Sequence, residues 1–209
     1  MIDAIKALKL LQEGNSRFVK GLRCVETMMT HVKREELTTG QEPFAIILGC
    51  SDSRVPAELV FDQGLGDLFV IRVAGNIVAP SQIGSVEFAA SQFKTRLVVV
   101  LGHTQCGAIC ATIEEMKRPN SEQSLNIKAI VDRIRPSVEP FKVTELWDDD
   151  IVLVEQAMRS NVRASVNQLR HGSTILENLC ENENLLIVGA EYSLETGEVV
   201  FFDGLPDGS

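Results

Sequence analysis

The sequence predicts an α/β fold with a mostly parallel central sheet, an antiparallel edge strand and helices on both faces. Short apolar runs of strand type alternate along the chain with longer segments of helical spacing, as in folds built from parallel strands and crossover helices. These runs lack polar alternation, which is typical of parallel strands buried on both sides. The final run follows its predecessor through the short turn Glu195-Thr196-Gly197, which predicts the antiparallel edge strand.

Each strand is expected from one apolar run. The second run ends at the turn Ala74-Gly75-Asn76, and the run Leu97–Leu101 consists of leucine and valine alone. The expected strands are residues 44–49, 67–73, 97–102, 185–190 and 199–202.

The first twenty residues are expected to form an amphipathic helix, because Ile5, Leu8 and Leu11 recur three residues apart. Asp3 is the candidate N-cap, and Gly14-Asn15 is a candidate interruption. Further helical segments are expected at residues 56–60, 84–93, 107–116, 122–134 and 151–180.

Length and charge restrict the class of protein. A chain of 209 residues can bury a substantial core as one domain, which we divide into an N-terminal helical arm, residues 1–40, and an α/β domain, residues 41–209. The net charge of −9 argues against a nucleic-acid partner, because such proteins neutralise phosphates with clustered Lys and Arg. No apolar stretch approaches the length of a membrane span, so no membrane partner is expected.

Cysteine usage indicates a reducing compartment. The five cysteines show no disulfide rhythm, and residues 1–6 lack the layout of a secretory signal. A cytoplasmic location is therefore expected, where thiols remain available for metal. Cys24 and Cys180 are interpreted as small apolar fillers, and His31 and His171 as surface histidines.

Two short motifs about fifty residues apart carry the chemistry. Cys50-Ser51-Asp52-Ser53-Arg54 follows one apolar run, and His103-Thr104-Gln105-Cys106 follows another. Parallel neighbouring strands would bring both motifs to the carboxyl edge of the sheet, where α/β proteins build their sites. Cys50, His103 and Cys106 form a donor set of two sulfurs and one nitrogen that suits zinc. Three protein ligands leave a fourth position for water, the arrangement of a catalytic zinc.

The neighbouring residues refine this interpretation. Asp52 and Arg54, two residues apart in a turn, are expected to pair in bidentate fashion. Cys106 would stand at a helix N-terminus, where the backbone dipole favours the thiolate. A structural zinc would need a fourth ligand, for which Cys110 and Asp52 are the candidates, although Ala108-Ile109-Cys110-Ala111 is interpreted as a buried helix face.

With these motifs in place, the chain resembles a β-class carbonic anhydrase. The resemblance is carried by Cys50–Arg54 and by Gly102-His103-Thr104-Gln105-Cys106-Gly107, with support from residues 69–76 and 84–89. It is close over roughly residues 40–112. Gln41 is retained and Ile47 stands where one subgroup has Trp, so the chain resembles the Gln-containing, plant-type-like subgroup.

The resemblance implies one Zn²⁺ per subunit, held by Cys50, His103 and Cys106, with Asp52 as a further ligand only in a closed state. It implies Asp52 and Arg54 as the catalytic pair. The position of Phe88 is often Tyr in relatives, so a role for that hydroxyl is not carried over. The implied substrate-binding residues are Gln41, Phe69, Ala74, Phe88 and Gly107.

The implied activity is the reversible hydration of carbon dioxide to bicarbonate and a proton by zinc-bound hydroxide. Alternatives are hydrolysis of carbonyl sulfide or carbon disulfide at the same site and, from another class, a non-enzymatic zinc or thiol sensor that uses Cys50, Cys106 and Cys110. The resemblance also implies a homodimer or a dimer of dimers, with part of each pocket contributed by the neighbouring subunit.

Overall fold

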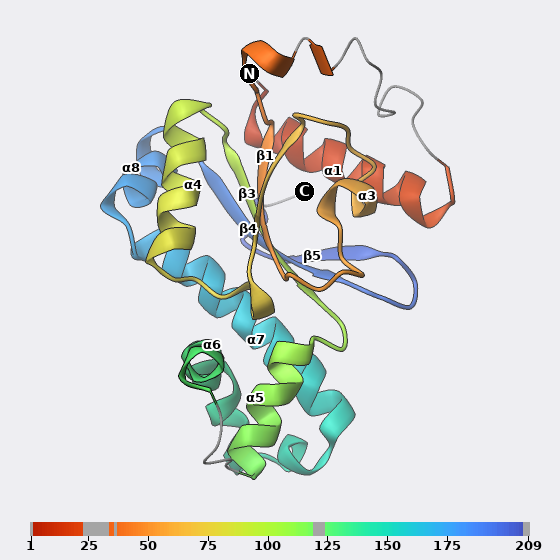
Figure 1. Cartoon of the computed structure of the whole chain (residues 1–209), viewed down its shortest axis with the longest axis vertical. Helices are drawn as coiled ribbons and strands as arrows, with labels where there is room; N and C mark the ends of the chain where they lie inside the picture. The colour runs from red at the N-terminus through yellow and green to blue at the C-terminus, as the bar shows by residue number, and fades with distance from the viewer. Residues whose placement is uncertain (1, 23–33, 36, 119–123, 207–209) are drawn as a thin grey trace.

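The computed structural model describes residues 2–22, 34–35, 37–118 and 124–206. Within these residues, a five-stranded sheet has the order β2-β1-β3-β4-β5 (Figure 1). The first four strands are parallel, and β5 pairs antiparallel with β4. The strands are β1 Ala45–Gly49, β2 Leu68–Arg72, β3 Leu97–His103, β4 Leu186–Tyr192 and β5 Val199–Asp203. The predicted fold class, including its antiparallel edge, is confirmed.

Helices cover both faces of this sheet, and none that the structure describes is long and apolar enough to cross a membrane. The α-helices are α1 Ala4–Val19, α3 Ala57–Val60, α4 Pro80–Gln92, α5 Gly107–Lys117, α6 Leu125–Val138, α7 Asp150–His171 and α8 Thr174–Asn182. Short 3₁₀ turns are η2 Leu37–Thr39, η3 Ala74–Asn76, η4 Glu139–Val143 and η5 Glu145–Asp148.

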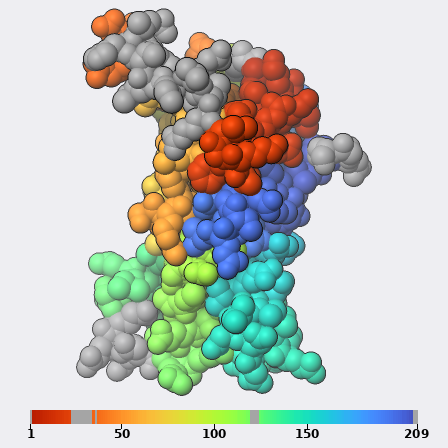
Figure 2. Space-filling model, turned by 90° about the vertical axis from the view of Figure 1, so that its right-hand side faces the viewer, coloured from red at the N-terminus to blue at the C-terminus, as the bar shows by residue number. Residues whose placement is uncertain are grey.

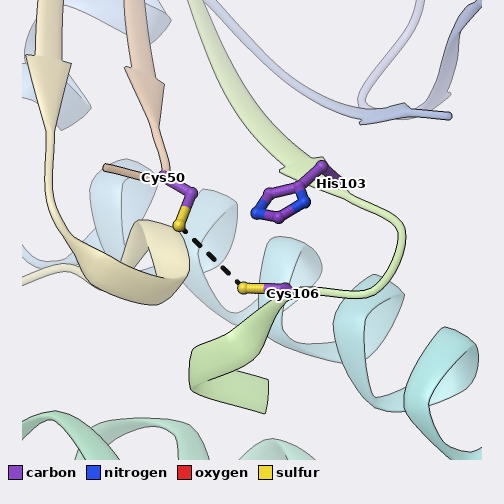
Figure 3. A group of neighbouring side chains, drawn as sticks. All are labelled: Cys50, His103 and Cys106. Carbon is purple, nitrogen blue, oxygen red and sulfur yellow. Dashed lines mark hydrogen bonds between the residues drawn. The ribbon is translucent and has the colours of Figure 1, made fainter. Parts of the chain in front are cut away.

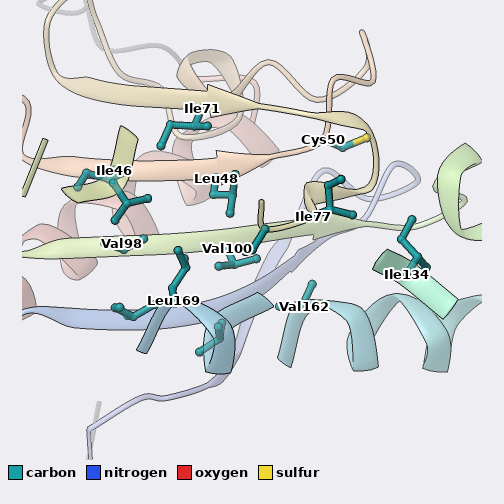
Figure 4. Close-up of a cluster of buried hydrophobic side chains, with 14 of the residues drawn as sticks. Ile46, Leu48, Cys50, Ile71, Ile77, Val98, Val100, Ile134, Val162 and Leu169 are labelled. Carbon is teal, nitrogen blue, oxygen red and sulfur yellow. The ribbon is translucent and has the colours of Figure 1, made fainter. Parts of the chain in front are cut away.

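The two faces of the sheet have separate cores because successive strand residues point in opposite directions. Ile46 and Leu48 of β1 belong to the cluster that includes side chains of α4, α7 and α8 (Figure 4). Ala45 and Ile47 belong to the cluster under α1 and α3. Each fully buried aliphatic side chain of this size contributes roughly 1.5–3 kcal/mol to folding.

Beyond the carboxyl ends of the parallel strands lies a helical lobe, formed by α5, α6 and the first half of α7 (Figure 1). In the space-filling view its green and cyan surfaces lie below the blue β4–β5 hairpin (Figure 2). The sheet and this lobe meet at the carboxyl edge of the sheet, where the two sequence motifs follow β1 and β3.

The N-terminal helix differs from the prediction in one respect. Asp3 is the N-cap as predicted, and its carboxylate accepts a hydrogen bond from Lys6 N at 2.8 Å. The predicted interruption at Gly14-Asn15 is wrong, because α1 continues to Val19. A Cβ on Gly14 would stand 1.8 Å from the carbonyl oxygen of Phe61, so this glycine allows close packing.

Asn15 also serves a tertiary contact. Its amide donates to the carbonyls of Val60 and Gly197, and its oxygen accepts from Val199 N. Helix α1 therefore packs on the sheet of its own chain. Cys24, His31 and the rest of residues 23–33 lie outside the described residues, so the extent of the arm stays a prediction.

Helix α4 begins at Pro80, four residues before the predicted start at Gly84. Proline is tolerated in the first helical turn because its missing N–H would have had no partner there. The helix therefore covers more of the sheet than the apolar pattern indicated.

Helix α7 approaches the sheet closely because glycines lie beneath it. A Cβ on Gly102 of β3 would stand 2.6 Å from Cγ2 of Val162 and 2.7 Å from Sδ of Met158. A Cβ on Gly189 of β4 would stand 2.8 Å from Cγ1 of the same valine. Both approaches are too short for any side chain larger than hydrogen.

We expect Gly102→Ala to lower the free energy of unfolding by about 1–3 kcal/mol, because overpacking forces neighbouring side chains out of position. Gly84→Ala is the matched control, since a Cβ at that exposed helical position meets nothing within 4 Å. The control should leave stability unchanged or raise it by about 0.5–1 kcal/mol. Urea unfolding at one protein concentration measures both. Equal effects of the two variants would contradict the close-packing argument.

Candidate functional site

The candidate site lies where β1 and β3 end. Cys50 directly follows β1, His103 is the last residue of β3, and Cys106 is the N-cap of α5. Because β1 and β3 are parallel neighbours, their carboxyl ends meet at one edge of the sheet. The donor atoms of the three side chains lie within 4.8 Å of one another, and the two sulfurs are 4.0 Å apart (Figure 3).

This donor set fits zinc. Two sulfurs at about 2.3 Å from a tetrahedral zinc would be separated by roughly 3.8 Å, close to the observed Cys50–Cys106 distance. His103 is fully buried, and its Nδ1 lies 2.9 Å from the carbonyl oxygen of Thr104. A carbonyl can only accept, so Nδ1 carries the proton and Nε2 presents a lone pair. Nε2 is buried and has no hydrogen-bond partner among the described residues, as expected of a ligand nitrogen.

The two thiols depend on each other electrostatically. A hydrogen bond from Cys106 lowers the pKa of the Cys50 thiol, with further help from the Gly75 N–H and against the effect of burial. The same bond, together with burial, raises the pKa of Cys106. One proton is therefore lost readily and the second is held between the sulfurs. A cation is needed to keep both sulfurs as thiolates at this separation.

Asp52 and Arg54 form the predicted pair beside these ligands. Oδ1 of Asp52 accepts from N and Nε of Arg54 at 2.9 and 3.0 Å, and Oδ2 accepts from Nη2 at 2.8 Å. These bonds hold the pKa of the Asp52 carboxyl well below its usual range. Oδ2 also lies 3.9 Å from Nε2 of His103. An ionised acceptor therefore stands next to the donor set.

Sequence reasoning missed the contacts that hold the Cys50 turn. Arg72, at the end of β2, donates from Nε to the carbonyl of Cys50 at 3.0 Å and from Nη2 to that of Asp52 at 2.5 Å. The N–H of Gly75 donates to Sγ of Cys50 at 3.4 Å. In turn, Nδ2 of Asn161 donates to the carbonyl of Gly75 at 2.8 Å. The signal available in the sequence was the presence of two polar residues, Asn161 and Ser165, on the apolar face of α7.

Two of the predicted pocket residues lie near the ligands in sequence and in structure. Ala74 begins η3 and is adjacent to Gly75, which contacts Cys50. Gly107 follows Cys106, and a Cβ added to it would meet nothing within 4 Å. The backbone beside the donor set is thus left accessible at Gly107.

The other three predicted pocket residues are Gln41, Phe69 and Phe88. Phe69 and Phe88 form an aromatic group with Phe93, and Gln41 lies beside it. The rings of Phe69 and Phe88 are 6.3 Å apart, and Phe93 contacts both at 6.0 and 5.5 Å. Gln41 and Phe93 line one hollow. Phe69 pairs in register with Ile46, four residues before the first ligand.

Four strand residues span about 13 Å, and Gln41 precedes β1 altogether. The structure of one chain therefore does not bring the aromatic group to the donor set. Half of Phe88 is exposed, so the group lies open at the molecular surface.

Cys110 corrects one expectation about the local helix. The segment 108–111 was predicted to be a buried helix face, but Cys110 and Ala111 are exposed. Only Ile109 of that segment is buried, because α5 contacts the core along a narrow stripe. Cys110 does not belong to the metal-capable group. Cys180 is partly buried against the core and His171 is exposed, as predicted.

The fold and the soft donor group together define an α/β metalloprotein. Residues 45–199 match the sequence profile of the carbonic anhydrase family. Carbonic anhydrase 2 of Mycobacterium tuberculosis is 36% identical over 201 residues, which cover 96% of this chain and 94% of that protein. The carbonic anhydrase of Mycolicibacterium smegmatis is 36% identical over 205 residues, covering 98% and 96%.

Solved structures agree with this assignment. The β-carbonic anhydrase CcaA superposes with a TM-score of 0.72 at 25% identity, covering 94% of this chain and 95% of that chain. The β-carbonic anhydrase CafA of Aspergillus fumigatus has the same fold, with a TM-score of 0.75 at 21% identity and coverage of 97% and 91%. The chain belongs to the β class of the carbonic anhydrase family.

We expect Cys106→Ser to remove most of the zinc from the purified protein, because a hydroxyl is a much poorer zinc ligand than a thiolate. Cys110→Ser is the matched control, one helical turn further along α5 and outside the donor group. Elemental analysis after gel filtration gives zinc per chain, expected near one for wild type and control. Full zinc content in Cys106→Ser would remove that residue from the ligand set.

Proposed function

We propose that this chain catalyses the reversible hydration of carbon dioxide to bicarbonate and a proton, with one zinc per subunit. The observation that carries the proposal is the convergence of three soft donor atoms within 4.8 Å, next to an ionised carboxylate fixed by a guanidinium. Family membership supports the same activity, since the curated relatives at 36% identity are carbonic anhydrases.

The ligands and the pair have distinct roles in the proposal. Cys50, His103 and Cys106 hold the zinc, which supplies a Lewis acid that makes water nucleophilic near neutral pH. Asp52 accepts a hydrogen bond from the attacking water and directs its lone pair toward the substrate carbon. Arg54 keeps Asp52 ionised and correctly oriented, because both carboxylate oxygens are engaged by its N–H groups.

The substrate side of the pocket needs an apolar wall, since carbon dioxide is apolar and competes with water for the site. Ala74 provides apolar surface beside the Cys50 turn, and Gly107 lets a small molecule approach the backbone next to Cys106. The proposed closed state, with Asp52 as a zinc ligand, would require the carboxylate to leave Arg54. In this structure the carboxylate is hydrogen-bonded to Arg54.

We expect Asp52→Asn to retain zinc and to lose roughly 10²-fold or more of kcat/KM, the range that a positioned acid–base group contributes. The three ligands remain, whereas the amide can no longer act as an ionised acceptor or pair with Arg54. Stopped-flow carbon dioxide hydration, with zinc measured on the same samples, checks both parts. Glu58→Gln removes an exposed carboxylate outside the pair and should keep full activity.

Loss of zinc from Asp52→Asn, or full activity in it, would contradict the assigned role. A zinc-loaded wild type that fails to hydrate carbon dioxide would overturn the proposed function.

We also propose that the chain acts as a homodimer or a dimer of dimers, with each site completed by the partner's aromatic group. Within one chain Phe69 lies opposite Ile46, four strand residues before the first ligand, Phe88 contacts Phe69, and Gln41 precedes β1. They form a surface-exposed apolar cluster with a nearby amide donor. Contact between two copies would bury this cluster and supply the missing wall and oxygen-binding amide. The retained Gln41 is the basis for placing the chain in the Gln-containing subgroup.

Complementation between two defective chains tests the composite site. A heterodimer of Gln41→Ala and Asp52→Asn holds one intact site, which combines Asp52 of the first chain with Gln41 of the second. We therefore expect about half of wild-type activity per heterodimer, when the two chains carry different affinity tags and are purified on both.

The control pairs Asp52→Asn with Cys106→Ser, which both affect the part of the site that a single chain supplies. Each site of that heterodimer keeps one defect, so activity should not recover. No recovery in the Gln41→Ala pair would contradict a site shared between subunits.

A cytoplasmic location is proposed on the chemistry of the thiols. Cys50 and Cys106 are free and 4.0 Å apart, and zinc binding needs both in the reduced state. A reducing compartment maintains that state.

A further inference from the structure

Two polar side chains interrupt the apolar face of α7. Asn161 is 2% exposed and Ser165 is 4% exposed, and the neighbouring Val162 and Val166 are fully buried. Buried polar groups destabilise a fold unless they are hydrogen-bonded. Both residues contact the same short segment, the η3 turn, with Asn161 donating to the carbonyl of Gly75 and Ser165 to that of Asn76.

The η3 turn has an unfavourable backbone that such contacts stabilise. Gly75 has φ 69° and Asn76 has φ 42°, so two successive residues occupy the left-handed region. A Cβ on Gly75 would stand 2.7 Å from Cδ1 of Ile134 and 3.0 Å from Cβ of Ala108, so glycine is required there. Strained conformations persist where the surrounding structure holds them. Here α7 holds both carbonyls of the left-handed pair.

The result of this conformation is a hydrogen bond to a ligand sulfur. With its carbonyl held by Asn161, Gly75 directs its N–H at Sγ of Cys50, 3.4 Å away. An N–H bond to a thiolate withdraws electron density from the sulfur. That effect matters at a site with two thiolates, because they place more negative charge on a metal than neutral imidazoles do and so weaken it as a Lewis acid.

We propose that Asn161 is a positioning residue of the metal centre, which acts through Gly75 to maintain the N–H···S bond and thereby limits electron donation from Cys50. The effect of this contact on catalysis rests on the proposed function. The N–H···S bond itself can be detected without measuring activity. Asn161 is distant in sequence from every ligand and touches neither ligand nor substrate.

The test compares Asn161→Leu with Ser165→Ala, which removes another buried hydrogen bond to the same turn. We expect Asn161→Leu to bind zinc 10- to 100-fold more weakly in chelator competition, because the turn that contacts Cys50 is no longer held in position. This is the range found when an outer partner of a metal ligand is lost. In the Co²⁺-loaded variant, the sulfur-to-metal charge-transfer absorption should shift to longer wavelength, since Cys50 becomes the stronger donor. Ser165→Ala should change both properties much less, because it bonds the carbonyl of Asn76, one residue further from the N–H that contacts Cys50. Asn161→Gln, which keeps a donor, should restore part of both.

Equal effects of Asn161→Leu and Ser165→Ala, or no effect of either, would overturn the inference and leave Asn161 a general support of the turn. If Asn161→Leu does not fold, Asn161→Ala takes its place, because its smaller side chain fits the buried position and cannot donate to the carbonyl.

The wild-type chain loaded with ¹¹³Cd provides a direct check. The amide proton of Gly75 should show scalar coupling to the metal through the hydrogen bond, and its absence would also overturn the inference. A wild type that shows this coupling and the spectral shift on substitution, but no carbon dioxide hydration, would refute the proposed function and support the role of Asn161.

Discussion

The parallel pairing of β1 with β3 is the constraint on which the site depends. Gly49 lies opposite Leu101, so Cys50 and His103 emerge at one edge and Cys106 reaches them after a short turn. A shift of one residue in this pairing would turn every side chain of the strand to the other face. The cores on the two faces prevent that shift, because Ile46 is buried in one core and Ile47 in the core on the opposite face. The packing of the sheet thereby sets the geometry of the donors.

Guanidinium and N–H groups gather around the donor atoms, although the chain as a whole carries a net charge of −9. Arg54 faces Asp52, Arg72 holds two carbonyls of the Cys50 turn, and the Gly75 N–H points at a sulfur. Cys106 caps the N-terminus of α5, where the helix dipole favours negative charge. These groups favour negative charge at the sulfurs, and a bound cation is still needed to keep both of them ionised.

Much of the fold was predictable because its signals are local. Apolar runs predicted each strand that the structure describes, and the residues that follow two of these strands predicted the donor group. Gly14-Asn15 was misinterpreted because a glycine that permits close packing looks the same in sequence as one that ends a helix. The exposure of Cys110 was missed because α5 contacts the core along a stripe narrower than its apolar run.

Contacts between residues far apart in the chain could not be predicted from the sequence, for a different reason. The bond between Asn161 and Gly75 joins residues 86 positions apart, and no local pattern specifies such a pair. The separation of Gln41, Phe69 and Phe88 from the ligands became visible only with the strand register. Their assigned role in the pocket depends on how two copies meet, which the fold of one chain does not determine.

Helix α7 links two properties that are usually studied apart. The same helix lies against Gly102 and Gly189 of the sheet and supports the turn that contacts Cys50. Natural variants that repack its inner face would therefore lose thermal resistance and metal occupancy together. A survey that scores only residual activity would attribute to catalysis a defect that begins in the hydrophobic core.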